Sequence, residues 1–328
     1  MFKKVPKGIE KVEKKENFSD KVLHAYYSKN DSNFYKTEDK ENYAESSSGS
    51  TNKKLPVVIS IGGGKGGIGK SFLTANIAVR LASLGFKVSA IDLDLGAANL
   101  HTCLGVPTPM KGVSNFFQGE VETLEETGTE THIPNLTLYA GNQDFWQHVK
   151  PYGSQKIKLI NCLQKLNSDY VFIDLGAGTH VHTLDFFIFS DAGLLVVVPE
   201  PTSIENAYAF MKNVMFRKVQ NICRAFEIKQ ELENQLLQKI VSLSAGTTPF
   251  NEFSKFIHDN TEIDKEIIAI VKATNVGIVM NQVRTQEDKD LGLSMSSICS
   301  QYFGFSSQFL GSMRYDDSAW KSIRIRKP

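Results

Sequence analysis

The sequence of 328 residues has few cysteines and almost no net charge. Only four cysteines are present, and no two of them form the C-x-x-C pair on which many zinc sites and redox motifs depend. Lys and Arg number 37 against 36 Asp and Glu, which leaves a net charge of +1. We therefore expect idle or buried thiols and no broad electrostatic affinity for nucleic acid.

Long apolar runs are also lacking. The most apolar stretch, residues 186–198, is interrupted by Ser190, Asp191 and Gly193, and a membrane-spanning helix needs roughly 18 apolar residues. The first residues, MFKKVPKGIEKVEKKE, do not contain the apolar segment of a secretory signal. A hydrophobic content of 41% is typical of a globular protein with a full core. These features predict a cytoplasmic protein.

Composition divides the chain at about residue 54. Residues 1–54 mix Lys, Glu, Asn and Ser, and such a composition buries too little apolar surface to offset the entropy of ordering. We expect a disordered charged tail and linker, followed by one domain at residues 55–328. Within the tail, residues 18–27 place Val22, Leu23, Tyr26 and Tyr27 on one helical face. That segment is either an element that docks to a partner or a transient helix.

A glycine-rich loop is the strongest functional signal. Residues 64–71, GKGGIGKS, follow a β-branched run at 57–60 and match the pattern G-x-x-x-x-G-K-[ST]. Glycines let successive backbone N–H groups point at phosphate oxygens, and the next helix adds the partial positive charge of its N-terminus. We expect Lys70 to reach the β- and γ-phosphates and Ser71 to bind Mg²⁺. The predicted binding residues are Gly64, Lys65, Gly66, Gly67, Ile68, Gly69, Lys70, Ser71 and Phe72.

Acidic residues end two further predicted strands. Asp92 and Asp94 follow the strand KVSAI, and Asp174 closes the strand YVFI. Open α/β sheets bind ligands at the carboxyl ends of their strands, so these carboxylates are expected to face the phosphates. A strand that ends in Asp is the Walker B form, whose carboxylate holds a Mg²⁺-bound water. A simpler role for Asp92 and Asp94 is to cap the next helix.

The remainder predicts a doubly wound, mostly parallel sheet of about seven or eight strands with helices on both faces. Residues 193–198 and 275–280 are expected strands, and Thr202 or Ser203 is the expected N-cap of the helix after PEPT. Apolar spacing predicts a helical excursion at about 215–272, which is either a partner surface or extra packing. The amide of Asn281 presents a donor and an acceptor that match an adenine edge, although a turn-forming Asn is the alternative.

Together the motifs resemble the MinD/ParA family of P-loop ATPases. Lys65 inside the loop gives K-G-G-x-G-K-S, which is similar to that family's deviant Walker A motif, and D-x-D-x-x-x-x-N follows the second strand. The segment DLGAG at 174–178 resembles the switch II sequence of the branch that contains flagellar-number regulators (FlhG/FleN-like). Phe72 departs from the family pattern, which commonly has a second hydroxyl residue at that position.

The resemblance implies an ATP-dependent homodimer with slow hydrolysis until a partner binds. Lys65 would reach across the dimer to the partner's nucleotide, Asp94 would orient the attacking water, and Asp92, Asp174 and Ser71 would surround Mg²⁺. Catalytic roles thus fall on Lys65, Lys70 and Asp94, and Asn281 would read adenine. The implied process is placement or number of flagella, or of another polar or cell-division structure, with a partner from that machinery. A DNA-segregating ParA-type ATPase and a small-molecule ATP-dependent ligase are the alternatives.

Membrane contact is expected to be peripheral and weak. Members of the MinD branch often continue into an amphipathic membrane-targeting helix, and this sequence ends with the basic, partly apolar stretch at 318–328. Such a stretch could contact an anionic inner membrane surface or form a helix docked on the domain.

Overall fold

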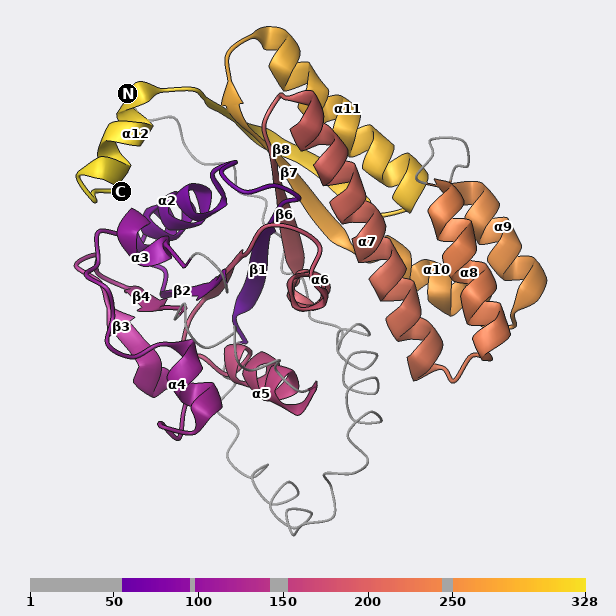
Figure 1. Ribbon diagram of the computed structural model, residues 1–328, viewed down its shortest axis with the longest axis horizontal. Coiled ribbons are helices and arrows are strands. Elements are labelled where there is room, and N and C mark those ends of the chain that lie inside the picture. The colour runs from indigo at the N-terminus through magenta and orange to yellow at the C-terminus, as the bar shows by residue number, and fades with distance from the viewer. Residues whose placement is uncertain (1–54, 95–97, 142–152, 244–249) are drawn as a thin grey trace.

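A computed structural model describes residues 55–94, 98–141, 153–243 and 250–328 (Figure 1). The expected tail, including the segment at 18–27, lies outside these residues. One eight-stranded sheet with the order β3-β4-β2-β5-β1-β6-β7-β8 organises the described chain. Every pairing is parallel except β3 with β4. The strands are β1 (Val57–Gly62), β2 (Val88–Leu93), β3 (Gly128–Glu130), β4 (Leu136–Tyr139), β5 (Tyr170–Leu175), β6 (Ala192–Val197), β7 (Asn275–Val283) and β8 (Ser306–Arg314). The expected doubly wound sheet is confirmed.

The central strands are buried because helices cover both faces of the sheet at its centre. Such strands carry continuous apolar runs rather than alternating ones, and β6 (AGLLVV) shows this pattern. One face packs on a large core shared with α5, α6, α7 and α11, and the other packs on a smaller core shared with α2 and α3. These helices are α2 (Lys70–Ser83), α3 (Leu100–Cys103), α5 (Gly153–Leu163), α6 (Val181–Phe189), α7 (Pro201–Ala225) and α11 (Gln286–Phe303).

A lobe of helices lies beyond α7, away from α2 (Figure 1). It contains α8 (Gln230–Leu243), α9 (Phe250–Asn260) and α10 (Asp264–Lys272). Their apolar faces join the large core through side chains such as Leu236, Phe253 and Ile267. The expected helical content of this region is therefore present.

The predicted N-cap of α7 is wrong. Glu200 occupies the N-cap position and Pro201 is the first helical residue, where its fixed φ and missing N–H fit the free end of a helix. The Ser203 hydroxyl instead accepts a hydrogen bond of 3.1 Å from Val198 N. Ser203 therefore ties the start of α7 to the end of β6.

Several short elements were not expected. Residues 105–136 contain α4 (Val113–Gln118), a 3₁₀ turn at Glu125–Thr127 and β3. The last strand, β8, runs from Ser306 to Arg314. The chain then forms α12 (Asp317–Arg324), whose N-cap Asp316 accepts from Ser318 N at 2.7 Å. Among the described residues, we find no helix that combines the length and apolar character needed to cross a membrane.

Candidate functional site

The glycine-rich loop joins β1 to α2 and has no room for side chains at several positions. A Cβ on Gly64 would overlap the Asn206 carbonyl, and one on Gly69 would overlap the amide of Asn281. Gly67 and Gly69 have φ values of 76° and 93°, a region that glycine adopts without strain. The glycines of this loop therefore allow a backbone cradle at the N-terminus of a 14-residue helix.

Lys70 and Ser71 open that helix beside the acidic residues. Lys70 is 6% exposed, and its ammonium donates to the Lys65 carbonyl at 3.3 Å. Burial lowers its pKa, and the carboxylates of Asp174 and Asp94 oppose that shift. The Ser71 side chain hydrogen-bonds to Asp174. The structure thus brings Lys70, Ser71, Asp94 and Asp174 together as the sequence predicts.

Asp92 and Asp174 are buried neighbours on adjacent strands. They are paired in register across β2 and β5, and each is 1% exposed. Burial raises the pKa of both carboxyls. Repulsion from Asp92 adds to the rise at Asp174, and repulsion from Asp94 adds to the rise at Asp92. Within the described residues, the Oδ2 atom of Asp174 has no hydrogen-bond partner. Two buried carboxylates with an unused oxygen are unfavourable in isolation, so this site favours a bound cation.

The oxygens of Asp92 already have partners. Oδ1 accepts from Asp94 N and Oδ2 accepts from Leu100 N, both at 3.0 Å. Asp92 therefore holds the turn between β2 and α3, which resembles the capping alternative. The role of Asp92 around Mg²⁺ stays a prediction. Asp92 would act on the ion through its negative charge and by fixing the position of Asp94.

The segment after β5 packs against the loop and Asp94. Gly178 N donates to the Gly63 carbonyl at 3.3 Å, and a Cβ on Gly176 would lie 3.1 Å from Oδ1 of Asp94. A side chain at Gly176 would displace Asp94. The glycines of DLGAG therefore permit close contact between the segment after β5 and the predicted water-orienting residue.

Lys65 lies at the edge of the site rather than inside it. Its Nζ atom is 3.3 Å from Oε2 of Glu200 and 3.4 Å from Oγ1 of Thr202, and its side chain is 42% exposed. Glu200 is the N-cap residue of α7. An exposed pair of this kind contributes little to stability, so Lys65 is able to exchange partners.

Asn281 contacts the loop directly. Its Nδ2 donates to the Ile68 carbonyl and its Oδ1 accepts from Gln282 N, both at 2.8 Å. The side chain is 8% exposed. Asn281 therefore ties β7 to the loop. Its contact with adenine stays a prediction, and that contact would use the second hydrogen and the second oxygen lone pair of the amide.

The residues present fit a magnesium ion that arrives with a phosphate ligand. No group of three or more His, Cys, Asp or Glu that could hold a metal occurs in the described part of the chain. Mg²⁺ commonly binds through one or two side chains together with substrate phosphates and waters. Ser71 and the unpartnered oxygen of Asp174 match that donor set, and Mg²⁺ bound there would neutralise phosphate charge.

The contact between Glu200 and Lys65 is not predictable from the sequence. The PEPT segment is recognisable there, but its position beside the glycine-rich loop is not. The adjacency arises because β6 pairs with β1, so that the loops following these two strands meet at one edge of the sheet. The only local signal was an acidic residue directly after a buried strand.

These observations define the class as a P-loop nucleotide-binding protein with a doubly wound sheet. The family described as CobQ/CobB/MinD/ParA nucleotide binding domain matches residues 59–327. The chain belongs to this family.

Within it, the chain is similar to a flagellum site-determining protein and to an antiactivator. It is 34% identical over 172 residues to the flagellum site-determining protein YlxH of Helicobacter pylori, covering 49% of this chain and 54% of that protein. It is 24% identical over 272 residues to the antiactivator FleN of Pseudomonas aeruginosa, covering 82% and 78%. The chain thus spans about half the length of the first of these relatives.

Solved structures show the same fold. The septum site-determining protein MinD of Pyrococcus horikoshii, complexed with Mg-ADP, matches with a TM-score of 0.54 at 20% identity, covering 83% of this chain and 87% of that one. A ParA family ATPase from Chlorobium tepidum matches with a TM-score of 0.52 at 17% identity, covering 83% and 89%.

Proposed function

We propose that this protein is an ATP-hydrolysing dimerisation switch that regulates the number or placement of flagella. The observation that carries the proposal is the convergence of Lys70, Ser71, Asp94 and Asp174 on one glycine cradle, with Lys65 exposed at its rim. The flagellar role is supported by the name of one relative, the flagellum site-determining protein YlxH, and the second relative, the antiactivator FleN, supports a regulatory role. A MinC:MinD complex among the similar structures supports a partner protein.

Each residue has a separate task in this proposal. Lys70 and the loop amides hold the β- and γ-phosphates, and Ser71 with Asp174 holds Mg²⁺. Asp94 orients the water that attacks the γ-phosphate. Lys65 leaves Glu200 and contacts the nucleotide of the second subunit, so that hydrolysis requires the dimer. After hydrolysis the shared phosphate contact is lost and the subunits separate.

The test is the mass of the purified full chain with ADP and with ATP, measured by sedimentation or light scattering. We expect a monomer with ADP, a dimer with ATP, and a monomer under both conditions for Lys65→Ala. Lys87→Ala, which removes another exposed loop lysine, is the matched control and should still dimerise. A wild-type monomer with ATP would contradict the switch.

A further inference from the structure

Thr74 is a buried polar residue that lies outside the glycine-rich motif. The motif ends at Ser71, and Thr74 lies three residues further along α2 with 0% of its surface exposed. Its neighbours in the helix, Leu73, Ala75 and Ala78, belong to the smaller apolar core. Burying a hydroxyl is unfavourable unless the group is hydrogen-bonded. The contacts of this hydroxyl therefore indicate its role.

The Thr74 hydroxyl has two acceptors within hydrogen-bond distance. Its Oγ1 atom lies 2.9 Å from the Lys70 carbonyl oxygen and 3.4 Å from Oδ1 of Asp174. The first contact is the usual bond of a helical Thr to the carbonyl four residues before it. The second contact joins α2 to the end of β5. Because a hydroxyl carries one hydrogen, the two acceptors share it, and an ionised carboxylate attracts that hydrogen more strongly than a carbonyl does.

Two hydroxyls of α2 act on the same carboxyl group. The Ser71 side chain hydrogen-bonds to Asp174, and Thr74, three residues further on, lies on the same face of the helix. Within the part of the chain that the structure describes, Oδ2 of Asp174 has no hydrogen-bond partner. Thr74 thus contacts Oδ1, which restrains the rotation of the carboxyl group and leaves Oδ2 free for a cation.

We propose that Thr74 is a positioning residue of the Mg²⁺ site, which it serves by orienting the Asp174 carboxylate. The inference rests on the proposed binding of Mg²⁺ with a nucleotide and needs neither the dimer nor the flagellar role. When Asp174 is ionised, the Thr74 hydroxyl donates to Oδ1, so that Oδ2 remains available to Mg²⁺ or to a water bound to it. Loss of such an outer hydrogen bond commonly weakens metal binding by about 10–100-fold. The shared bond of 3.4 Å places the expected loss at the lower end of that range.

Nucleotide binding by the full chain at varied Mg²⁺ concentration tests this role. The probe is a non-hydrolysable ATP analogue, titrated by calorimetry with Mg²⁺ and with EDTA. Thr74→Val removes the hydroxyl and keeps the shape of the side chain, and Thr74→Ser keeps the hydroxyl. We expect Thr74→Val to need about tenfold more Mg²⁺ for half-maximal binding and to bind the metal-free nucleotide as the wild type does. Thr74→Ser should retain the wild-type Mg²⁺ requirement.

Two further variants separate the hydrogen bond from packing. Thr74→Ala also lacks the hydroxyl and introduces no group that crowds the core, so it carries the test should Thr74→Val not fold. Thr127→Val is the matched control, because Thr127 is 1% exposed and its hydroxyl donates to the Leu124 carbonyl at 2.7 Å, outside the candidate site. The control should leave the Mg²⁺ requirement unchanged.

Four outcomes would overturn the proposal. A wild-type Mg²⁺ requirement in Thr74→Val and Thr74→Ala would mean that the hydroxyl serves the helix alone. Weakening by the same factor with Mg²⁺ and with EDTA would assign Thr74 to the phosphate-binding loop through Lys70. If Thr74→Ser is as impaired as Thr74→Val, the packing of the side chain, and not its hydroxyl, decides metal binding. A wild-type chain that binds no nucleotide would contradict the proposed function itself, whereas the first three results leave that function intact.

Discussion

Lys65 and Glu200 form an ion pair within one chain, with Nζ and Oε2 3.3 Å apart. Both side chains are largely exposed, at 42% and 58%, so solvent screens the attraction and the pair contributes at most about 1 kcal/mol. The pair therefore restrains the lysine without fixing it. A weak pair of this kind is compatible with the proposed switch, in which Lys65 leaves Glu200 when ATP is bound.

The first prediction separates folding from function at Lys65. Lys65→Ala should leave the free energy of unfolding within about 1 kcal/mol of the wild-type value, because only an exposed pair is lost. The same variant should lose its ATP-dependent dimer. Urea unfolding and sedimentation measure the two effects. A large loss of stability would mean that Lys65 has a structural role.

The second prediction concerns Asp174 and pH. Burial and the nearby Asp92 raise the pKa of Asp174 to about 8, from an ordinary value of 3.8. Below about pH 4 such a carboxyl is protonated in both the folded and the unfolded chain and does not affect stability. As pH rises toward 8 it ionises in the unfolded chain first, which destabilises the folded nucleotide-free protein. Asp174→Asn should therefore stabilise that form by about 1–3 kcal/mol at pH 8 and by little at pH 4.

Urea unfolding across this pH range measures the difference, with the exposed-site variant Asp259→Asn as the control that should show none. Asp174→Asn should also lose Mg²⁺-dependent nucleotide binding. A variant that is destabilised at pH 8 would show that the carboxylate has a favourable partner in the folded chain.

The third prediction concerns Lys218, which is 4% exposed on α7. It donates to the Thr274 hydroxyl at 2.6 Å, and burial lowers its pKa to about 8. Burying a charged lysine lowers the free energy of unfolding, and this loss has its full size below pH 8. The loss decreases as pH rises toward about 10.5, the pKa of the lysine in the unfolded chain. Lys218→Met should raise the free energy of unfolding at pH 7 by about 1–3 kcal/mol.

The gain should shrink between pH 8 and 10. Lys87→Met, at an exposed lysine, is the control, and it should change stability by less than about 0.5 kcal/mol. An equal gain at every pH would show that the effect is apolar packing and that the charge of Lys218 is not involved.

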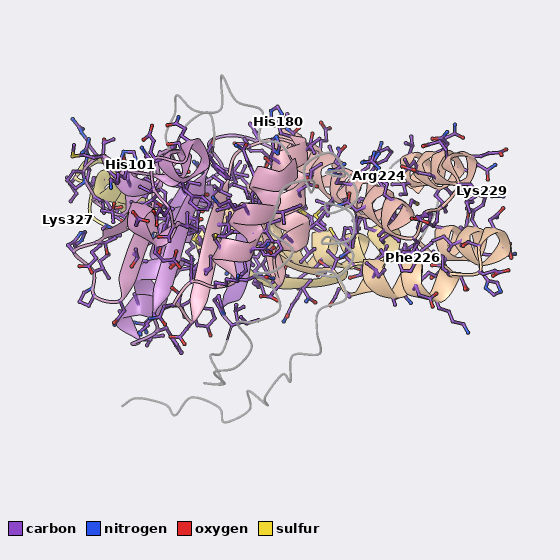
Figure 2. All side chains as sticks on the ribbon, turned by 90° about the horizontal axis from the view of Figure 1, so that it is seen from below. His101, His180, Arg224, Phe226, Lys229 and Lys327 are labelled. Atoms are coloured by element: carbon purple, nitrogen blue, oxygen red, sulfur yellow. The ribbon has the colours of Figure 1, made fainter. Side chains whose placement is uncertain are left out.

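The fourth prediction concerns Gly105, which follows α3. Its φ is 69°, and a Cβ there would overlap the Arg326 carbonyl. Figure 2 shows His101 of α3 and Lys327 at the same end of the molecule. Gly105→Ala should therefore displace the C-terminal turn and cost about 2–3 kcal/mol.

The control is Gly119→Ala, because Gly119 has a φ of 74° and no atom lies within 4 Å of a Cβ built there. This variant measures the backbone strain alone and should lose about 1 kcal/mol of stability. Thermal unfolding gives the stabilities, and limited proteolysis should release the C-terminal residues only from the Gly105 variant. Equal losses in the two variants would mean that the contact with Arg326 contributes nothing.

The fifth prediction decides between two roles of Asn281. Because its amide bonds to the Ile68 carbonyl at 2.8 Å, Asn281→Ala should weaken ATP and GTP binding by a similar factor, through loss of order in the loop. Titration with each nucleotide measures both affinities. A loss confined to ATP would instead assign the side chain to adenine recognition.

Much of the fold follows from local pattern. The loop at 64–71 and the strands ending at Asp92 and Asp174 were predicted because their periodicity and turn chemistry are local. The partner of Lys65 was not, because it depends on β6 pairing beside β1. The bonds of Asn281 and the crowding of Asp92 against Asp174 likewise depend on strand order. The short elements α4 and β3 were missed because their glycine-rich surroundings resemble loop.

The most direct test of the central claim, that Lys65 acts on the nucleotide of the second subunit, mixes two inactive variants. Lys65→Ala keeps its own Asp94, and Asp94→Asn keeps its own Lys65. A mixed dimer therefore contains one complete site, built from Asp94 of one chain and Lys65 of the other. We expect each variant alone to hydrolyse ATP negligibly and the mixture to regain a substantial fraction of wild-type turnover, up to about half per mixed dimer. A mixture as inactive as its components would contradict action across the dimer.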